Sequence, residues 1–206
     1  MLRALTLALC ALTVGLAVLV PSTARAQSTI GPGWERIWTH AQLPDGPLYW
    51  QLQTFATRDA AEAVAGPSAQ MGEAEGQVWL FTLGRSGAAP AGGTHVAEIG
   101  PLEVPNAAEY ELRITYRSTP PGGALGAATG AAVHFHPGAE SFYVLAGEQT
   151  VWTPGRQART EAGQSWPGEP AGTPMLLVNT GTTERRAFTF YVGDAAQPWV
   201  IPTVFQ

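Results

Sequence analysis

Hydrophobic positions in the second half of the chain recur at the spacing of short β-strands. Between Glu111 and Arg117, Leu112, Ile114 and Tyr116 alternate with polar residues, the period of a half-buried strand. Further short strands, separated by turns rich in Gly and Pro, are predicted over residues 131–136, 141–145, 149–153, 164–166, 175–179 and 187–192. Strand and turn thus alternate about every ten residues, which is typical of an antiparallel sandwich or barrel and unlike βαβ units.

The first half of the chain shows a weaker pattern. A short helix is predicted over residues 57–65, with Thr57 as its N-cap and a Gly-Pro pair after its end. Aromatic and β-branched residues predict strands over residues 48–55, 77–83 and 95–99. We therefore expect additional strands and one short helix N-terminal to the regular region.

The N-terminus has the pattern of a cleaved signal peptide. Arg3 precedes an apolar run of 17 residues (4–20), Pro21 ends the run, and Ala24-Arg25-Ala26 supplies small residues at the −3 and −1 positions. We expect residues 1–26 to be removed and the protein to be exported, periplasmic or extracellular. An uncleaved membrane anchor is the alternative, because 17 apolar residues lie at the lower edge of a spanning helix.

Composition narrows the expected partners. The chain has no lysine, and loss of the leader with its two arginines leaves 9 arginines against 16 acidic residues. Nucleic acids and anionic membranes bind to clusters of basic residues, so neither is expected as a partner of the mature chain. The only cysteine lies in the leader, so disulfide bonds contribute nothing. A small-molecule ligand or substrate is the expected partner.

One segment carries candidate metal chemistry. His134 and His136 are two residues apart in a predicted strand, so their side chains point to the same face. A Pro-Gly turn follows, and Glu140 opens the next strand, where its carboxylate can lie across from both imidazoles. Two imidazoles and a carboxylate on one face suit Fe, Mn, Zn or Ni. A lone His-x-His also occurs by chance, but the strand, turn and strand context, closed by Gly147, favours a metal site.

This segment resembles the first motif of the cupin superfamily, G-x5-H-x-H-x3/4-E-x6-G, with Ala128 in place of the leading glycine. Residues 163–179 resemble the second motif, G-x5-P-x-G-x2-H-x3-N, with one extra residue before Pro170. The resemblance covers roughly residues 111–192. It implies an all-β fold, the cupin double-stranded β-helix or jelly-roll barrel, here with extra N-terminal strands and a short helix.

The resemblance also suggests how the chain is divided. We expect a signal peptide at 1–26, an N-terminal segment packed on the barrel at 27–105, the cupin barrel at 106–196 and a C-terminal tail at 197–206. A homodimer is expected from the resemblance alone.

The second motif departs from the family at one position. Met175 stands where most metal-binding cupins have a histidine ligand. A thioether is a weak ligand for hard divalent ions. Three outcomes remain open: three protein ligands with water at the other positions, ligation by the Met175 sulfur (which would favour copper), or loss of the metal, with the histidines binding a ligand through hydrogen bonds.

The sequence leaves two main functions open, and a protein-interaction or envelope-structural role, with the N-terminal segment as docking surface, is a third. The first is an exported metal-dependent cupin of oxygenase, isomerase or lyase type that acts on a small polar organic molecule, with no catalytic residue singled out. The second is a non-catalytic cupin that binds a small ligand without metal. In either case Tyr143, Trp152 and Trp166 are expected to line the pocket, and Arg113 and Arg117 to lie on a solvated face.

Overall fold

A computed structural model of the chain describes residues 33–125 and 132–206. The expected signal peptide and Ala128 lie outside these residues. The strands are β1 (Trp34–His40), β2 (Leu48–Phe55), β3 (Ala69–Ala74), β4 (Gln77–Gly84), β5 (Thr94–Leu102), β6 (Tyr110–Thr119), β7 (Ala124–Leu125), β8 (Val133–Phe135), β9 (Ala139–Ala146), β10 (Glu148–Thr153), β11 (Arg156–Glu161), β12 (Ser165–Trp166), β13 (Met175–Val178), β14 (Arg185–Asp194) and β15 (Ile201–Pro202), and the helix is α1 (Arg58–Glu62).

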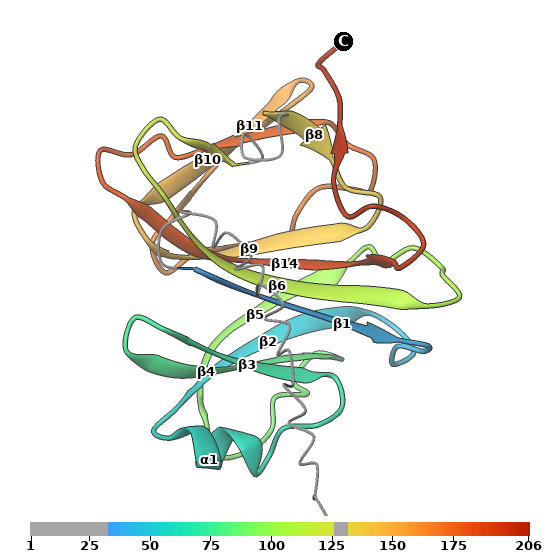
Figure 1. The fold of residues 1–206 in the computed structure, drawn as a ribbon, viewed down its shortest axis with the longest axis vertical. Coiled ribbons are helices and arrows are strands. Elements are labelled where there is room, and N and C mark those ends of the chain that lie inside the picture. Colours follow the sequence, from blue (N-terminus) through green and yellow to red (C-terminus); the bar gives the residue numbers. More distant parts are fainter. Residues whose placement is uncertain (1–32, 126–131) are drawn as a thin grey trace, which may run out of the picture.

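Three antiparallel sheets lie one above another (Figure 1). The middle sheet has the order β1-β6-β14-β9-β12, and the sheet β11-β10-β13-β8-β15 faces it across the barrel interior, with β7 paired to β13. The third sheet, β3-β4-β2-β5, comes from the N-terminal part and covers the other face of the middle sheet. The all-β jelly-roll fold expected from the sequence is thereby confirmed.

Strand β14 shows how the sequence produces these layers. Phe188, Phe190 and Val192 alternate with Ala187, Thr189 and Tyr191, so the two sets point to opposite faces of the middle sheet. The first set packs in the core shared with the N-terminal sheet. The second set therefore faces the barrel interior. Because both faces are covered, all of these residues except Thr189, at 6% exposure, are at most 1% exposed.

Aromatic side chains dominate the core between the middle and N-terminal sheets. The Phe188 ring lies 4.8 Å from Phe81 and 4.9 Å from Trp79, both in edge-to-face geometry. Trp50 lies 5.3 Å from Phe190 on the same side. Such pairs add about 0.5–1.5 kcal/mol each beyond the area they bury. This core joins the N-terminal segment to the barrel.

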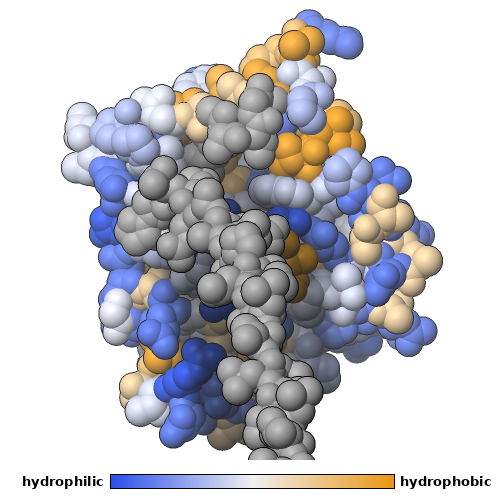
Figure 2. All heavy atoms as spheres, in the orientation of Figure 1, coloured by the Kyte–Doolittle hydropathy of each residue, from blue (hydrophilic) through white to orange (hydrophobic). Residues whose placement is uncertain are grey.

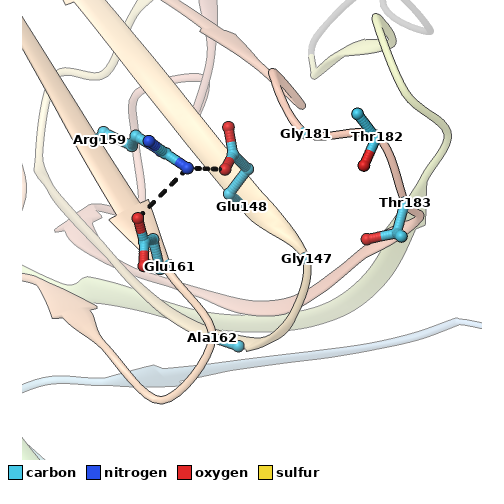
Figure 3. A pocket seen from close by; sticks show the side chains of 8 residues that line it. All are labelled: Gly147, Glu148, Arg159, Glu161, Ala162, Gly181, Thr182 and Thr183. Atoms are coloured by element: carbon cyan, nitrogen blue, oxygen red, sulfur yellow. Dashed lines mark hydrogen bonds and ion pairs between the residues drawn. The ribbon is translucent and has the colours of Figure 1, made fainter.

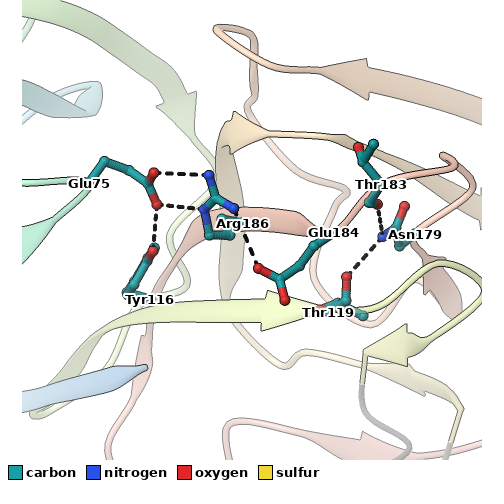
Figure 4. Close-up of polar contacts among 7 residues, drawn as sticks. All are labelled: Glu75, Tyr116, Thr119, Asn179, Thr183, Glu184 and Arg186. Carbon is teal, nitrogen blue, oxygen red and sulfur yellow. Dashed lines mark hydrogen bonds and ion pairs between the residues drawn. The ribbon is translucent and has the colours of Figure 1, made fainter. Parts of the chain in front are cut away.

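A polar contact at the edge of this core also links the two parts (Figure 4). Glu75, in the turn between β3 and β4, accepts hydrogen bonds from both Nε and Nη2 of Arg186 at 2.6 and 3.0 Å. The hydroxyl of Tyr116 donates to the same carboxylate at 2.6 Å. The hydrogen bonds from Arg186 and then Tyr116 lower the pKa of Glu75, while burial and the Glu75 carboxylate raise the pKa of Tyr116 to about 12.

The structure confirms the strands expected from the sequence and adds five: β1, β3, β7, β11 and β15. The helix is shorter than expected and begins after Thr57, whose hydroxyl accepts a hydrogen bond from the Ala60 N–H at 3.2 Å. The barrel sheets extend beyond the expected range 106–196 at both ends, because β1 pairs with β6 and β15 pairs with β8. The C-terminal residues are thus part of the barrel.

The surface in the orientation of Figure 1 is mostly hydrophilic, and the hydrophobic colour gathers near the end that carries the C-terminus (Figure 2). Among the described large hydrophobic residues, the exposed ones are Ile37, Val204 and Phe205. In the described part of the chain, no helix has the length and apolar character needed to cross a membrane.

Candidate metal centre

Two consecutive strands place the three candidate ligands. His134 lies in β8, His136 follows the strand, and Glu140 is the second residue of β9. Gly138 forms the turn between them, and a Cβ atom there would collide with the carbonyl of Val192. Gly168, with φ +98°, packs so closely on the carbonyl of Glu140 that a side chain would collide there too. The backbone that carries the three ligands is therefore held tightly.

His134, His136 and Glu140 converge in the structure as the sequence predicted. Ligand atoms of the three residues lie within 4.8 Å of one another. The Nε2 atom of His136 is 3.1 Å from Oε2 of Glu140, and the two imidazole rings are 5.0 Å apart and nearly perpendicular. All three residues are at most 5% exposed. Water therefore competes weakly for these atoms.

Backbone carbonyls orient the two imidazoles. Nδ1 of His136 donates to the carbonyl of Trp199 at 2.5 Å, and Nδ1 of His134 donates to that of Ala132 at 3.3 Å. A carbonyl only accepts, so the proton of each neutral ring lies on Nδ1 and the lone pair on Nε2. Such a contact commonly orients a metal-binding histidine.

Charge and burial act differently on the two histidines. Burial lowers the pKa of His134, against the attraction of the Glu140 carboxylate. Burial also lowers the pKa of His136, but the adjacent Glu140 carboxylate outweighs it, and the net shift is upward. The carboxylate thus favours a positive charge at this point of the interior.

The polar atoms at the centre of the cluster fit a cation. Nε2 of His136 and Oε2 of Glu140 are buried and lie at ion-pair distance, yet outside hydrogen-bond geometry, and neither has another hydrogen-bond partner among the described residues. Buried acceptors without a partner are destabilising. A divalent ion with affinity for imidazole and carboxylate would bind both. The residues present therefore fit a metal ion.

The C-terminal segment covers one side of the cluster. The ring of Trp199 lies 5.4 Å from that of His136, and the Arg113 guanidinium stacks over the Trp199 ring at 4.6 Å. Tyr191 pairs with both Glu140 and Arg113 across the middle sheet, so the three share the interior face. Arg113 also forms ion pairs with Glu35 and Glu111, and it is not on a solvated face as expected.

Met175 lies directly opposite His134 in the β8–β13 ladder. This register agrees with the alignment of the second motif, because residues paired in this way have neighbouring side chains on one face. Met175 is buried in an apolar cluster of the interior together with Phe142, Trp166 and Leu177. Trp166 thus packs inside the barrel, and its role as a pocket-lining residue stays a prediction.

The structure corrects the expectation for two other aromatic residues. Glu140 and Phe142 share the interior face of β9, so Tyr143 points the other way, to the core with the N-terminal sheet, 6.2 Å from Trp79. Trp152 pairs with Leu176, the residue next to Met175, and therefore lies on the outer face of its sheet. Neither residue lines the metal centre.

Comparison with known families identifies this part of the chain. Residues 120–191 match the family model of the cupin domain. These residues form a cupin domain. The match contains the three candidate ligands and Met175. The closing glycine of the first cupin motif, Gly147, has φ +70°, and its Cβ would lie 2.6 Å from the carbonyl of Glu184, which explains why glycine stands there. No curated protein matches the chain.

Several solved structures resemble the cupin domain. A Cupin 2 conserved barrel domain protein from Salinispora arenicola is 18% identical with a TM-score of 0.33, and the match covers 41% of this chain and 65%, slightly under two thirds, of that chain. A predicted oxalate decarboxylase from Thermotoga maritima is 22% identical with a TM-score of 0.32, covering 41% and 80%. Salicylate 1,2-dioxygenase from Pseudoaminobacter salicylatoxidans is 22% identical with a TM-score of 0.32, covering 39% and 19%.

Two surface hollows of the described residues lie away from the metal centre. One, of about 290 Å³, is lined by the β9–β10 and β11–β12 turns and by residues 181–183 (Figure 3). The Arg159 side chain bridges Glu148 and Glu161 there, so its charge is already paired. The other, of about 450 Å³, lies around residues 163–167. None of the three candidate ligands lines either hollow.

Sequence reasoning missed several residues around the interior. The Trp199 carbonyl acts through the backbone, so no side-chain pattern indicates it. The sequence predicts that Tyr191 and Phe142 lie in strands, but it does not show which face of the sheet each side chain occupies. His40 and His95, in β1 and β5, do not belong to the cluster.

Proposed function

We propose that His134, His136 and Glu140 hold one divalent metal ion, and that the cupin domain acts on a small polar organic molecule at this ion. The observation that supports this most directly is the buried pair of His136 Nε2 and Glu140 Oε2, which lie 3.1 Å apart and have no hydrogen-bond partner among the described residues. Fe, Mn, Zn and Ni all accept this set of donors.

The residues of the chain would contribute by orienting the metal ligands and by excluding water from the site. Three protein ligands would leave coordination positions for water and substrate, as in catalytic metal sites. A bound ion would supply Lewis-acid or redox chemistry there. The Trp199 carbonyl orients His136, and the Trp199 and Tyr191 rings exclude water from that side of it. The resemblance to cupins allows oxygenase, isomerase or lyase chemistry, and the proposal extends to this group of reactions.

Export is a second part of the proposal. It is supported by the N-terminal pattern of Arg3, an apolar run, a helix-breaking proline and Ala24-Arg25-Ala26. The mature chain would then meet its small-molecule substrate in the periplasm or outside the cell. We also retain the homodimer as a proposal.

A non-catalytic ligand-binding cupin is the alternative function. Met175 supports it, because this buried thioether stands opposite His134 where a further imidazole would strengthen metal binding. In that case the two Nε2 atoms would accept hydrogen bonds from a ligand, and no metal would be required.

Metal titration of the metal-depleted protein separates these functions. Calorimetry with Mn²⁺, Fe²⁺, Zn²⁺ and Ni²⁺ should show one site per chain, and Glu140→Gln should weaken it at least about tenfold, or 1.4 kcal/mol. His95→Ala is the matched control, since this histidine is exposed on β5, and its affinity should equal that of the wild type. Equal affinity of the wild type and Glu140→Gln would refute the proposed site.

A further inference from the structure

A second charged group lies in the barrel interior, apart from the metal ligands. Arg185 begins β14, in register with Thr119 of β6, and alternates with Ala187, Thr189 and Tyr191 on the interior face. Its exposure is 0%, whereas its neighbour Arg186 points outward to Glu75. Arg185 is therefore a wholly buried guanidinium.

The hydrogen bonds of Arg185 are incomplete. Its Nε donates to Oε1 of Gln149, on β10 of the facing sheet, at 2.7 Å. Its Nη1 and Nη2 have no partner among the described residues, and neither does Nε2 of Gln149, which is also 0% exposed. Since Arg185 and Gln149 are joined by the first bond, these three unpartnered nitrogens are gathered in one place, and all of them are donors.

Donors of this kind, with a positive charge, fit an anion. Burial lowers the pKa of Arg185 to about 9, against the attraction of the Glu140 carboxylate, so the guanidinium stays charged at neutral pH. No ion pair among the described residues includes Arg185, although a buried charge is strongly destabilising without a partner. The planar fork of Nη1 and Nη2 matches the two oxygens of a carboxylate.

The strand register shows that Arg185 and Gln149 lie apart from the metal centre. Met175 is paired with His134, and Leu177, two residues on, is paired with Val151. Gln149 lies two residues beyond Val151 on the same face. Measured along the strands, Gln149 therefore lies four residues from His134, which is about 13 Å at 3.3 Å per residue. Arg185 and Gln149 thus form a part of the interior separate from the metal ligands, and the Glu140 carboxylate attracts the Arg185 charge from there.

We propose that Arg185 and Gln149 form a carboxylate-binding subsite of the barrel, and that the molecule bound by the cupin domain carries a carboxylate group. The identity of that molecule as a substrate rests on the proposed function. The subsite itself does not, because no metal ligand contributes to it.

Calorimetry with defined probes tests the inference. Propionate, benzoate and succinate are titrated into the metal-free and the metal-loaded protein, with propionamide and benzamide as neutral counterparts and inorganic phosphate as a second anion. The carboxylates should bind and the amides should not. Arg185→Met should weaken carboxylate binding by roughly ten- to a hundredfold, the loss expected for hydrogen bonds to a charged group.

Two further variants keep the outcome decisive. Gln149→Glu places a carboxylate beside Arg185, so it should abolish anion binding even if Arg185→Met fails to fold. Arg58→Met removes an exposed arginine in α1 and should leave binding unchanged.

Undiminished carboxylate binding in Gln149→Glu or in folded Arg185→Met would overturn the inference, as would tighter binding of phosphate than of carboxylates or no binding of any probe to the wild type. A protein that binds carboxylates but no metal would contradict only the proposed function. One that binds metal but no carboxylate would contradict only this inference.

Discussion

Replacement of Phe188 by alanine tests whether the N-terminal segment and the barrel fold as one unit. This ring belongs to the middle sheet, is 0% exposed and lies 4.8–4.9 Å from Phe81 and Trp79 of the N-terminal sheet. Truncation would leave a cavity between the two sheets that surrounding β-structure fills only in part. The substitution therefore removes contacts on both sides of the interface at once.

The expected loss follows from this burial. Truncation of a buried phenylalanine to alanine destabilises a protein by about 3–5 kcal/mol. For a chain of this size, 1 kcal/mol shifts the melting temperature by about 2–4 °C, so we expect a decrease of roughly 6–20 °C. Phe205→Ala is the matched control, because this phenylalanine is 40% exposed, and its effect should stay within about 0.5 kcal/mol.

Urea unfolding, followed by both tryptophan fluorescence and far-ultraviolet circular dichroism, gives the free energy and the cooperativity. We expect a single transition with coincident probes in both variants. A loss below about 1 kcal/mol in Phe188→Ala, or two separate transitions of which only one responds, would refute the conclusion that this core unites the two parts.

Three further outcomes are expected. Met175→His should raise metal affinity in calorimetry, since the new imidazole would lie beside His134, and no gain would contradict the alignment of the second motif. Trp199→Ala keeps the backbone carbonyl that bonds His136 but removes the ring that lies 5.4 Å from the His136 ring, so admission of water should weaken metal binding by about tenfold, and an unchanged affinity would exclude this role of the ring. In urea titrations, Glu75→Gln should lower the free energy of unfolding above pH 4.5, the ordinary pKa of the carboxyl. The wild type should lose this advantage as the pH falls through the lowered pKa of Glu75. A difference between the two proteins that stays constant at acid pH would contradict this role of Glu75.

The predictions of the ligand cluster and of the barrel rest on local sequence patterns. His134 and His136 share a face because they are two residues apart in a strand, and a tight turn brings Glu140 opposite them. These relations need no knowledge of distant segments. The alternation of strands and turns likewise indicated the barrel, because each strand repeats the same period.

The failures share a dependence on distant partners. Tyr143 was placed in the pocket because β9 is apolar on both faces, and only the N-terminal sheet decides which face is the barrel interior. Strand β1 was missed because its alternation is imperfect: Trp34 and Trp38 pack on the core, whereas the apolar Ile37 points to the other face and is 50% exposed. Arg185 and Arg186 are adjacent and chemically identical, so the sequence alone does not reveal that one is buried and the other is paired with Glu75.

The metal content of the purified protein, produced without a histidine tag, tests the central claim most directly. Elemental analysis after growth with Fe, Mn, Ni, Zn and Cu should find about one divalent ion per chain, because three buried ligands converge within 4.8 Å. The His134→Ala, His136→Ala double variant should contain none. A wild type without metal under saturating supply, or a double variant that retains its metal, would contradict the account.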